Sequence, residues 1–153
     1  MGLGAWTRWR YNKALKICGI PSKMPNEWHE QQAIITWYRE LWPQHYRALR
    51  VSMNGLNLGG GRKAARMISQ MRAQGMVDGE ADIAIMLPTE AYGGLIIEHK
   101  ALGSKHDMTE GQRDYLQYHR DIGNQAFMTR GVEEAKEVIA SYMALTLSME
   151  SEQ

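Results

Sequence analysis

The sequence predicts an α/β fold in which a mixed four-stranded sheet is flanked by helices on both faces. Segments with apolar residues at helical spacing alternate along the chain with short apolar runs bounded by glycine or proline. The runs at 82–87 and 95–100 are separated only by a turn-rich segment, whereas the run at 125–129 follows through a predicted helix. A hairpin followed by a helical crossover gives neighbouring strands of both senses.

The first half of the chain opens with a basic and aromatic segment. We expect residues 1–25 to form an N-terminal arm, with a short helix over 6–18. Asn26 is a typical N-cap, and the apolar spacing that follows predicts a helix over 26–41, which Pro43 ends. Residues 46–52 are predicted to form a strand. A glycine-rich loop over 53–61 then leads to a helix over 62–74.

The second half supplies the other elements of the core. Residues 82–87 and 95–100 are predicted to form a β-hairpin, and 108–122 a helix that ends at Gly123. A short strand over 125–129 and an amphipathic helix from Val132 complete the order. The whole chain, 1–153, is then a single domain with a core over 26–145 and a frayed tail over 146–153.

Composition excludes several classes of protein. A chain of 153 residues has the size of a single domain, and it has no apolar run of about 18 residues that could span a membrane. Cys18 is the only cysteine, which excludes an internal disulfide and a thiolate-clustered zinc site. The N-terminus has no signal-peptide pattern, so we expect a cytoplasmic protein. If the chain is encoded by a phage, this is the host cytoplasm.

Charge is divided unequally along the chain. Residues 1–72 hold 12 Lys/Arg and 3 Asp/Glu, a net charge of +9, and residues 73–153 hold 6 and 14, a net charge of −8. This asymmetry favours a first half that binds a polyanion and a second half that concentrates carboxylates, on solvated helices or around a cation. The alternative is that the two halves simply attract each other.

Three charged residues are predicted to converge on the hairpin. Glu98 and Lys100 lie two apart on a strand, so both side chains leave the same face of the sheet, and Asp82 begins the partner strand. Two carboxylates about 4 Å apart repel by about 4 kcal/mol at an effective dielectric constant of 20, so the cluster needs a cation. Mg²⁺ is the natural candidate because it prefers oxygen ligands. Glu134 and Lys136 repeat the spacing on a helix, so only the strand context distinguishes the first pair.

The stretch from Gly75 to Lys100 resembles the VRR-NUC domain, a branch of the PD-(D/E)xK nuclease superfamily, which has a restriction-endonuclease-like core. The other segments that match the family occur in the same order: Glu30 and Gln31 in the first helix, Asn54 in the SMNG segment, Gly79, Asp82, Gln112 and Tyr115, and the TRGVEEA segment before the last helix. The resemblance covers most of the chain.

The resemblance also implies roles for individual residues. Asp82 and Glu98 would bind Mg²⁺ or Mn²⁺ together with the backbone carbonyl of His99, and Lys100 would be the catalytic lysine. Glu30 would reach the metal from the first helix, directly or through water. Gln112 would support the catalytic groups or the scissile phosphate. His99 departs from the apolar residue more common at this position, and we expect its side chain to face away from Glu98 and to be satisfied by hydrogen bonds beneath the sheet.

The expected substrate is DNA. The basic residues beside the glycine-rich loop would bind its backbone together with Asn54; they are Arg62, Lys63, Arg66 and Arg72. The alternative for these basic residues is a solvated helix face. The resemblance implies a metal-dependent, structure-specific endonuclease, in particular a homodimeric Holliday-junction resolvase acting on four-way junctions. Two alternatives stay open: a nuclease acting on flaps, nicks or general duplex DNA, and a DNA-binding accessory protein whose nuclease site has decayed.

Overall fold

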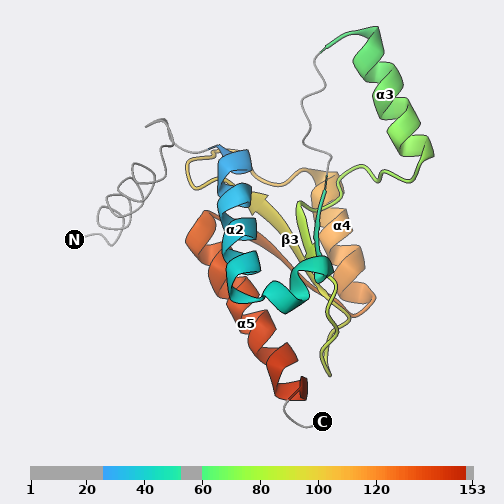
Figure 1. The fold of residues 1–153 in the computed structure, drawn as a ribbon. Coiled ribbons are helices and arrows are strands. Elements are labelled where there is room, and N and C mark those ends of the chain that lie inside the picture. Colours follow the sequence, from blue (N-terminus) through green and yellow to red (C-terminus); the bar gives the residue numbers. More distant parts are fainter. Residues whose placement is uncertain (1–25, 53–59, 151–153) are drawn as a thin grey trace.

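The computed structural model describes residues 26–52 and 60–150 (Figure 1). The predicted N-terminal arm and Asn54 lie outside the described residues. The sheet consists of β1 (Leu49–Val51), β2 (Ile83–Ile85), β3 (Leu95–Lys100) and β4 (Gln125–Arg130), in the order β1-β2-β3-β4. The β1–β2 and β2–β3 pairs are antiparallel and the β3–β4 pair is parallel, so the mixed four-stranded sheet is confirmed.

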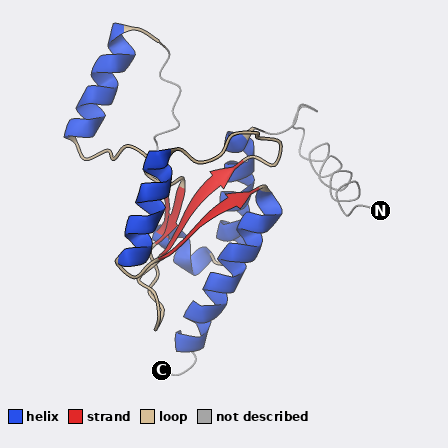
Figure 2. Cartoon of the chain, turned by 180° about the vertical axis from the view of Figure 1, so that it is seen from behind, coloured by secondary structure: helices blue, strands red, loops and turns tan. Residues whose placement is uncertain are grey.

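Helices cover both faces of this sheet, as predicted. The helices of the described residues are α2 (Glu27–Leu41), the 3₁₀ helix η1 (Pro43–Ala48), α3 (Arg62–Ala73), α4 (Glu110–Asp121) and α5 (Val132–Glu150). Helices α2 and α5 pack on one face and α4 on the other (Figures 1 and 2). None of the helices in the described ranges is long and apolar enough to cross a membrane.

Successive side chains of each strand point to opposite faces of the sheet, so each face has its own hydrophobic core. The larger core joins α2, α5 and the sheet, and its principal members are Ile34, Tyr38, Ile83, Ile85, Leu95, Ile97, Ile139, Tyr142 and Met143. The smaller core lies under α4 and consists of Ala81, Ile96, Leu116 and Ala126. Because β3 is buried on both faces, its odd-numbered side chains enter the larger core and its even-numbered side chains face α4.

Several predicted boundaries differ from the structure; the strand expected over 82–87, for example, is only Ile83–Ile85. The strand expected over 46–52 is only Leu49–Val51, because Pro43 starts the helical turn η1 and β2 offers only three residues for pairing. Helix α5 extends to Glu150, beyond residue 145, where we expected the core to end. Thr146 lies in that extension, is buried, and donates a hydrogen bond to Met143 O at 2.7 Å.

Gly79 allows a close contact between the segment before β2 and the start of α4. Its φ is +77°, and a Cβ atom there would lie 2.7 Å from Gly111 C and 3.1 Å from Gln112 N. We expect Gly79→Ala to lower the free energy of unfolding by about 2–4 kcal/mol, because backbone strain and a backbone clash add. Urea unfolding would measure this.

A matched control separates the two causes of that decrease. Gly123 also has a positive φ, of +94°, but a Cβ atom there meets no described atom within 4 Å. Gly123→Ala should therefore show only the strain contribution, about 1–2 kcal/mol. Equal decreases at the two positions would show that the close approach at Gly79 contributes nothing.

Candidate active site

The candidate site lies where β3 passes the start of α4. The register pairs Ile83 with Ile97, so Asp82 sits at the level of Glu98 on the neighbouring strand. Glu98 and Lys100 share the α4 face of the sheet, as their spacing predicted. The structure therefore brings Asp82, Glu98 and Lys100 together.

Glu98 is the centre of this cluster and is 1% exposed. Its Oε1 accepts a hydrogen bond from Lys100 Nζ at 2.6 Å and a short one from Gln112 Nε2. Among the residues that the structure describes, Glu98 Oε2 is buried without a hydrogen-bond partner. A buried carboxylate oxygen without a hydrogen-bond partner lowers the stability of the fold unless a ligand binds to it.

Helix capping fixes the side chain of Gln112. Thr109 is the N-cap of α4, and its Oγ1 accepts from Gln112 N at 3.3 Å. In return, Gln112 Oε1 accepts from Thr109 N at 2.9 Å, which completes a capping box. The amide nitrogen of Gln112 is thereby turned toward Glu98. Gln112 joins the cluster, as the family pattern implied.

Asp82 is held by the backbone of β3. His99 N donates to Asp82 Oδ2 at 2.8 Å, and Ser52 N donates to Asp82 O at 2.9 Å. The N–H and C=O groups of one strand residue point toward the same neighbour. The carbonyl of His99 is therefore directed to the side of Asp82, where the resemblance led us to expect a backbone ligand.

The pKa values of the cluster reflect its burial and the proximity of its charged groups. Burial and the nearby Asp82 raise the pKa of Glu98 from 4.5 to about 7, against the opposing effect of Lys100. Burial also raises the pKa of Asp82, although the hydrogen bond from His99 N lowers it. Burial alone would lower the pKa of Lys100, but its hydrogen bond and charge interaction with Glu98 raise it overall.

Glu27 belongs to this group and was not predicted. It lies in the first turn of α2. Its pKa is raised overall, because burial and the charge of Asp82 outweigh the opposing effect of Lys100. Glu27, Gln31 and Asp82 line one groove of about 590 Å³ along α2. The spacing of Glu27 and Gln31, one helical turn apart, was a usable signal because it places both on one helix face.

Glu30 has a different partner from the one expected. Its Oε2 lies 2.9 Å from His99 Nε2, and both carboxylate oxygens accept from Leu102 N, at 3.2 and 3.3 Å. These contacts occupy Glu30 on the larger-core face, whereas Glu27 lines the same groove as Asp82. The expectation for the His99 side chain is confirmed, because it faces this core and is hydrogen-bonded there.

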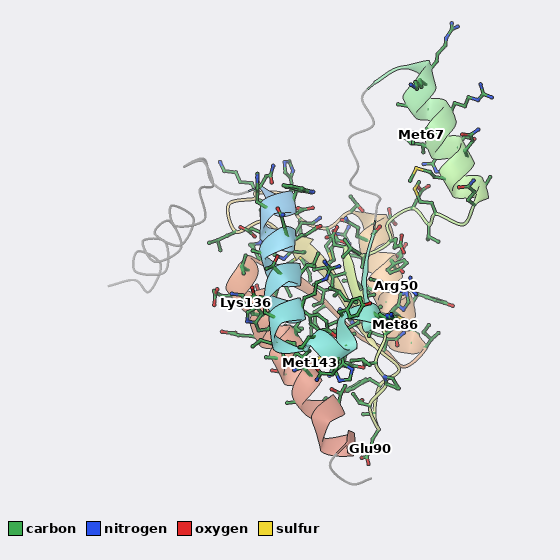
Figure 3. The ribbon with its side chains drawn as sticks, in the orientation of Figure 1. Arg50, Met67, Met86, Glu90, Lys136 and Met143 are labelled. Atoms are coloured by element: carbon green, nitrogen blue, oxygen red, sulfur yellow. The ribbon has the colours of Figure 1, made fainter. Side chains whose placement is uncertain are left out.

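The basic residues lie on a helix that stands apart from the rest of the chain. Figures 1 and 2 show α3 extending away from the sheet, and Figure 3 shows Met67 on it, far from the core. Arg62, Lys63 and Arg66 are exposed there. Arg72 forms an ion pair with Asp78 at 3.1 Å. The structure does not bring these residues to the carboxylate cluster.

The donor set at the end of β3 fits a hard divalent cation. Within residues 26–52 and 60–150, no three His, Cys, Asp or Glu side chains form a ready-made metal cage. Mg²⁺ is commonly held by one or two carboxylates, with water and substrate phosphate as the other ligands. The unpartnered Glu98 Oε2 and the raised carboxyl pKa values are what an added cation would relieve.

The raised pKa of Glu98 predicts a stability that depends on pH in metal-free protein. Between pH 4.5 and 7 the folded protein keeps the Glu98 proton and the unfolded chain releases it. The free energy of unfolding should fall across this window, by on the order of 3 kcal/mol from Glu98. Thermal unfolding in EDTA from pH 4.5 to 8 would measure the fall.

The same titration of Glu98→Gln isolates the contribution of this carboxyl group from that of the others. In the variant, the free energy of unfolding should fall less with pH, because the Glu98 contribution is missing. Saturating Mn²⁺ should likewise reduce the pH dependence of the wild type. Equal slopes for the metal-free wild type and Glu98→Gln would contradict the raised pKa.

Comparison with known proteins supports the fold. No family model matches the sequence, and no curated protein matches it. A solved structure described as a VRR_NUC domain protein is similar to this chain, with a TM-score of 0.65 and 22% sequence identity over 80% of this chain and 92% of that one. The chain therefore has the fold of a VRR_NUC domain protein, an α/β arrangement with a mixed four-stranded sheet, as its sequence predicted.

Proposed function

We propose that this protein is a Mg²⁺- or Mn²⁺-dependent endonuclease that cuts branched DNA, in particular four-way junctions. The observation that supports it most is the buried cluster of Asp82, Glu98 and Lys100 with an unpartnered carboxylate oxygen. The similarity of the fold to a VRR_NUC domain protein adds support for nuclease chemistry.

In this proposal, Asp82, Glu98 and Glu27 hold the cation together with the carbonyl of His99. A bound Mg²⁺ or Mn²⁺ would acidify a water molecule and neutralise charge on the phosphate. Lys100, 2.6 Å from Glu98, orients the attacking water or stabilises the charge that develops on phosphorus. Gln112 keeps Glu98 Oε1 occupied, so that Oε2 is the oxygen directed to the ligand.

The groove along α2 offers a path for the DNA strand to this cluster. It contains Glu27 and Asp82 at the site and continues past Gln31 to Arg39, a cation that suits a phosphate. Binding of the duplex arms falls to Arg62, Lys63 and Arg66 on the exposed helix α3. These basic side chains bind the phosphate backbone whatever the base sequence, which suits recognition of DNA structure over sequence.

Salt dependence tests the role of α3. The triple variant Arg62→Gln, Lys63→Gln, Arg66→Gln should bind DNA more weakly, and its slope of log affinity against log salt should be shallower by about 0.9 for each phosphate that the protein no longer neutralises. Fluorescence anisotropy with labelled junction at several salt concentrations would measure this. Arg72→Gln is the matched control, because Asp78 already holds Arg72. An unchanged slope in the triple variant would place the DNA elsewhere.

A homodimer is part of the proposal. Two coordinated cuts in a four-way junction require two active sites related by a two-fold axis. Light scattering with and without junction DNA would measure the oligomeric state, and a monomer in both conditions would contradict symmetric cleavage.

The direct test of substrate uses labelled four-way junction, flap, nicked, duplex and single-stranded DNA with Mg²⁺ or Mn²⁺. We expect paired symmetric cuts in the junction. Preferential cutting of flaps, nicks or duplex would favour a general repair nuclease, and preferential cutting of single strands would exclude the resolvase. Binding of DNA without divalent-metal binding or cutting would identify a decayed, DNA-binding accessory protein.

A further inference from the structure

Beneath the candidate site, a buried polar chain links α2 to β3 and β4. His99 is fully buried, and Glu30 and Thr129 are nearly or fully buried beside it. His99 Nε2 lies 2.9 Å from Glu30 Oε2, and His99 Nδ1 lies 3.2 Å from Thr129 Oγ1. Both ring nitrogens therefore have partners, and the ring is not available as a metal ligand or a base.

The same residue also reaches the site through its backbone. His99 N donates to Asp82 Oδ2, while its side chain leaves the opposite face of β3 and reaches α2. Glu30 lies one helical turn after Glu27, so holding Glu30 fixes the turn that carries Glu27. Leu102 N also donates to Glu30, which ties the chain after β3 to the same point.

We propose that His99 is a positioning residue that holds the first turn of α2, and with it Glu27, in register with Asp82 and Glu98. This inference rests on the proposed metal-dependent function, because the position of Glu27 matters only to a site that binds a cation. An apolar residue at position 99 would fill the same space without fixing this register. Residues that orient metal ligands in this way typically change metal affinity or activity by about 10–100-fold when they are replaced.

The test separates positioning from packing. Glu30→Met combined with His99→Leu replaces both buried partners by apolar side chains of similar size, a change that proteins often tolerate. We expect this double variant to fold with a Tm close to the wild type and to bind Mn²⁺ about 10–100-fold more weakly by calorimetry. Glu30→Gln, which still offers an amide oxygen to His99, should retain most of the affinity.

A second measurement does not depend on metal. Amide hydrogen exchange over residues 29–32 in metal-free protein should be at least about tenfold faster in the double variant, because Glu30 loses its hydrogen bonds with His99 and Leu102 N. Tyr142→Phe is the control, because it removes a buried hydrogen bond to Leu87 O, 2.6 Å long, in the same core and away from the site. It should leave Mn²⁺ affinity unchanged.

The outcomes are distinct. A folded double variant with wild-type Mn²⁺ affinity would overturn the positioning role. If the double variant does not fold, Thr129→Val removes only the partner of Nδ1, and wild-type affinity in that variant would likewise count against the inference. Failure of the wild type to bind Mn²⁺ would overturn the proposed function, and hydrogen exchange in α2 would then decide whether His99 holds that helix.

Discussion

Glu98→Gln should abolish Mn²⁺ binding and slow DNA cutting by about 10³-fold, the largest effect that we expect from a single substitution. The substitution keeps the shape of the side chain and the oxygen that accepts from Lys100 and Gln112. It removes the negative charge and the unpartnered oxygen that a cation would use. Calorimetry with Mn²⁺ and single-turnover cleavage of a junction would measure the two effects.

The second Glu-x-Lys sequence provides a control for this substitution. Glu134 is exposed, and its Oε2 accepts from Arg130 N at 2.8 Å, a bond that glutamine can keep. Glu134→Gln should leave metal binding and cleavage at wild-type values. Normal cleavage by Glu98→Gln would remove the carboxylate cluster from the mechanism.

Lys100→Met should slow cleavage by about 10²-fold while the protein still binds Mn²⁺. The apolar side chain fills the same buried space but no longer offers an ammonium group to water or phosphate. Without that ammonium group the pKa of Glu98 should rise further above about 7, so Mn²⁺ binding weakens at pH 7. Binding should recover at pH 8.5, whereas the cleavage rate should stay low.

Lys136→Met is the corresponding control. Lys136 pairs with Glu133 at 3.5 Å and lies over the ring of Trp37, on the side of the molecule formed by α2 and α5. Its replacement should affect neither binding nor cleavage. Recovery of the cleavage rate of Lys100→Met at pH 8.5 would mean that Lys100 acts only through the charge state of Glu98.

Local sequence patterns predicted most of the fold. The hairpin of β2 and β3, the crossover through α4 and the start of α2 at its Asn26 cap follow from turn, periodicity and capping signals. The short β1 could not be predicted because its length depends on β2, a pairing between distant segments. The continuation of α5 depends on burial of Thr146, which is likewise a tertiary interaction.

The candidate site was predictable to the extent that its residues share a strand or a capping motif. Glu98 and Lys100 follow from the two-residue period of β3, whereas Gln112 was implied only by the family resemblance, and the capping box that turns it toward Glu98 emerged from the structure. The choice between Glu27 and Glu30 was not predictable, since both lie in the first turn of α2. Only the rotation of that helix relative to the sheet decides which carboxylate contacts His99 and which lines the groove beside Asp82.

The side-chain amide of Gln112 forms hydrogen bonds both with the N-terminus of α4 and with the buried carboxylate of Glu98. Its oxygen accepts from Thr109 N while its nitrogen donates to Glu98. A cation bound at Glu98 would change the hydrogen bond that this carboxylate accepts from the Gln112 amide, and through it the bond from Thr109 N. We therefore expect the NMR signal of the Thr109 N–H to shift when the site is occupied.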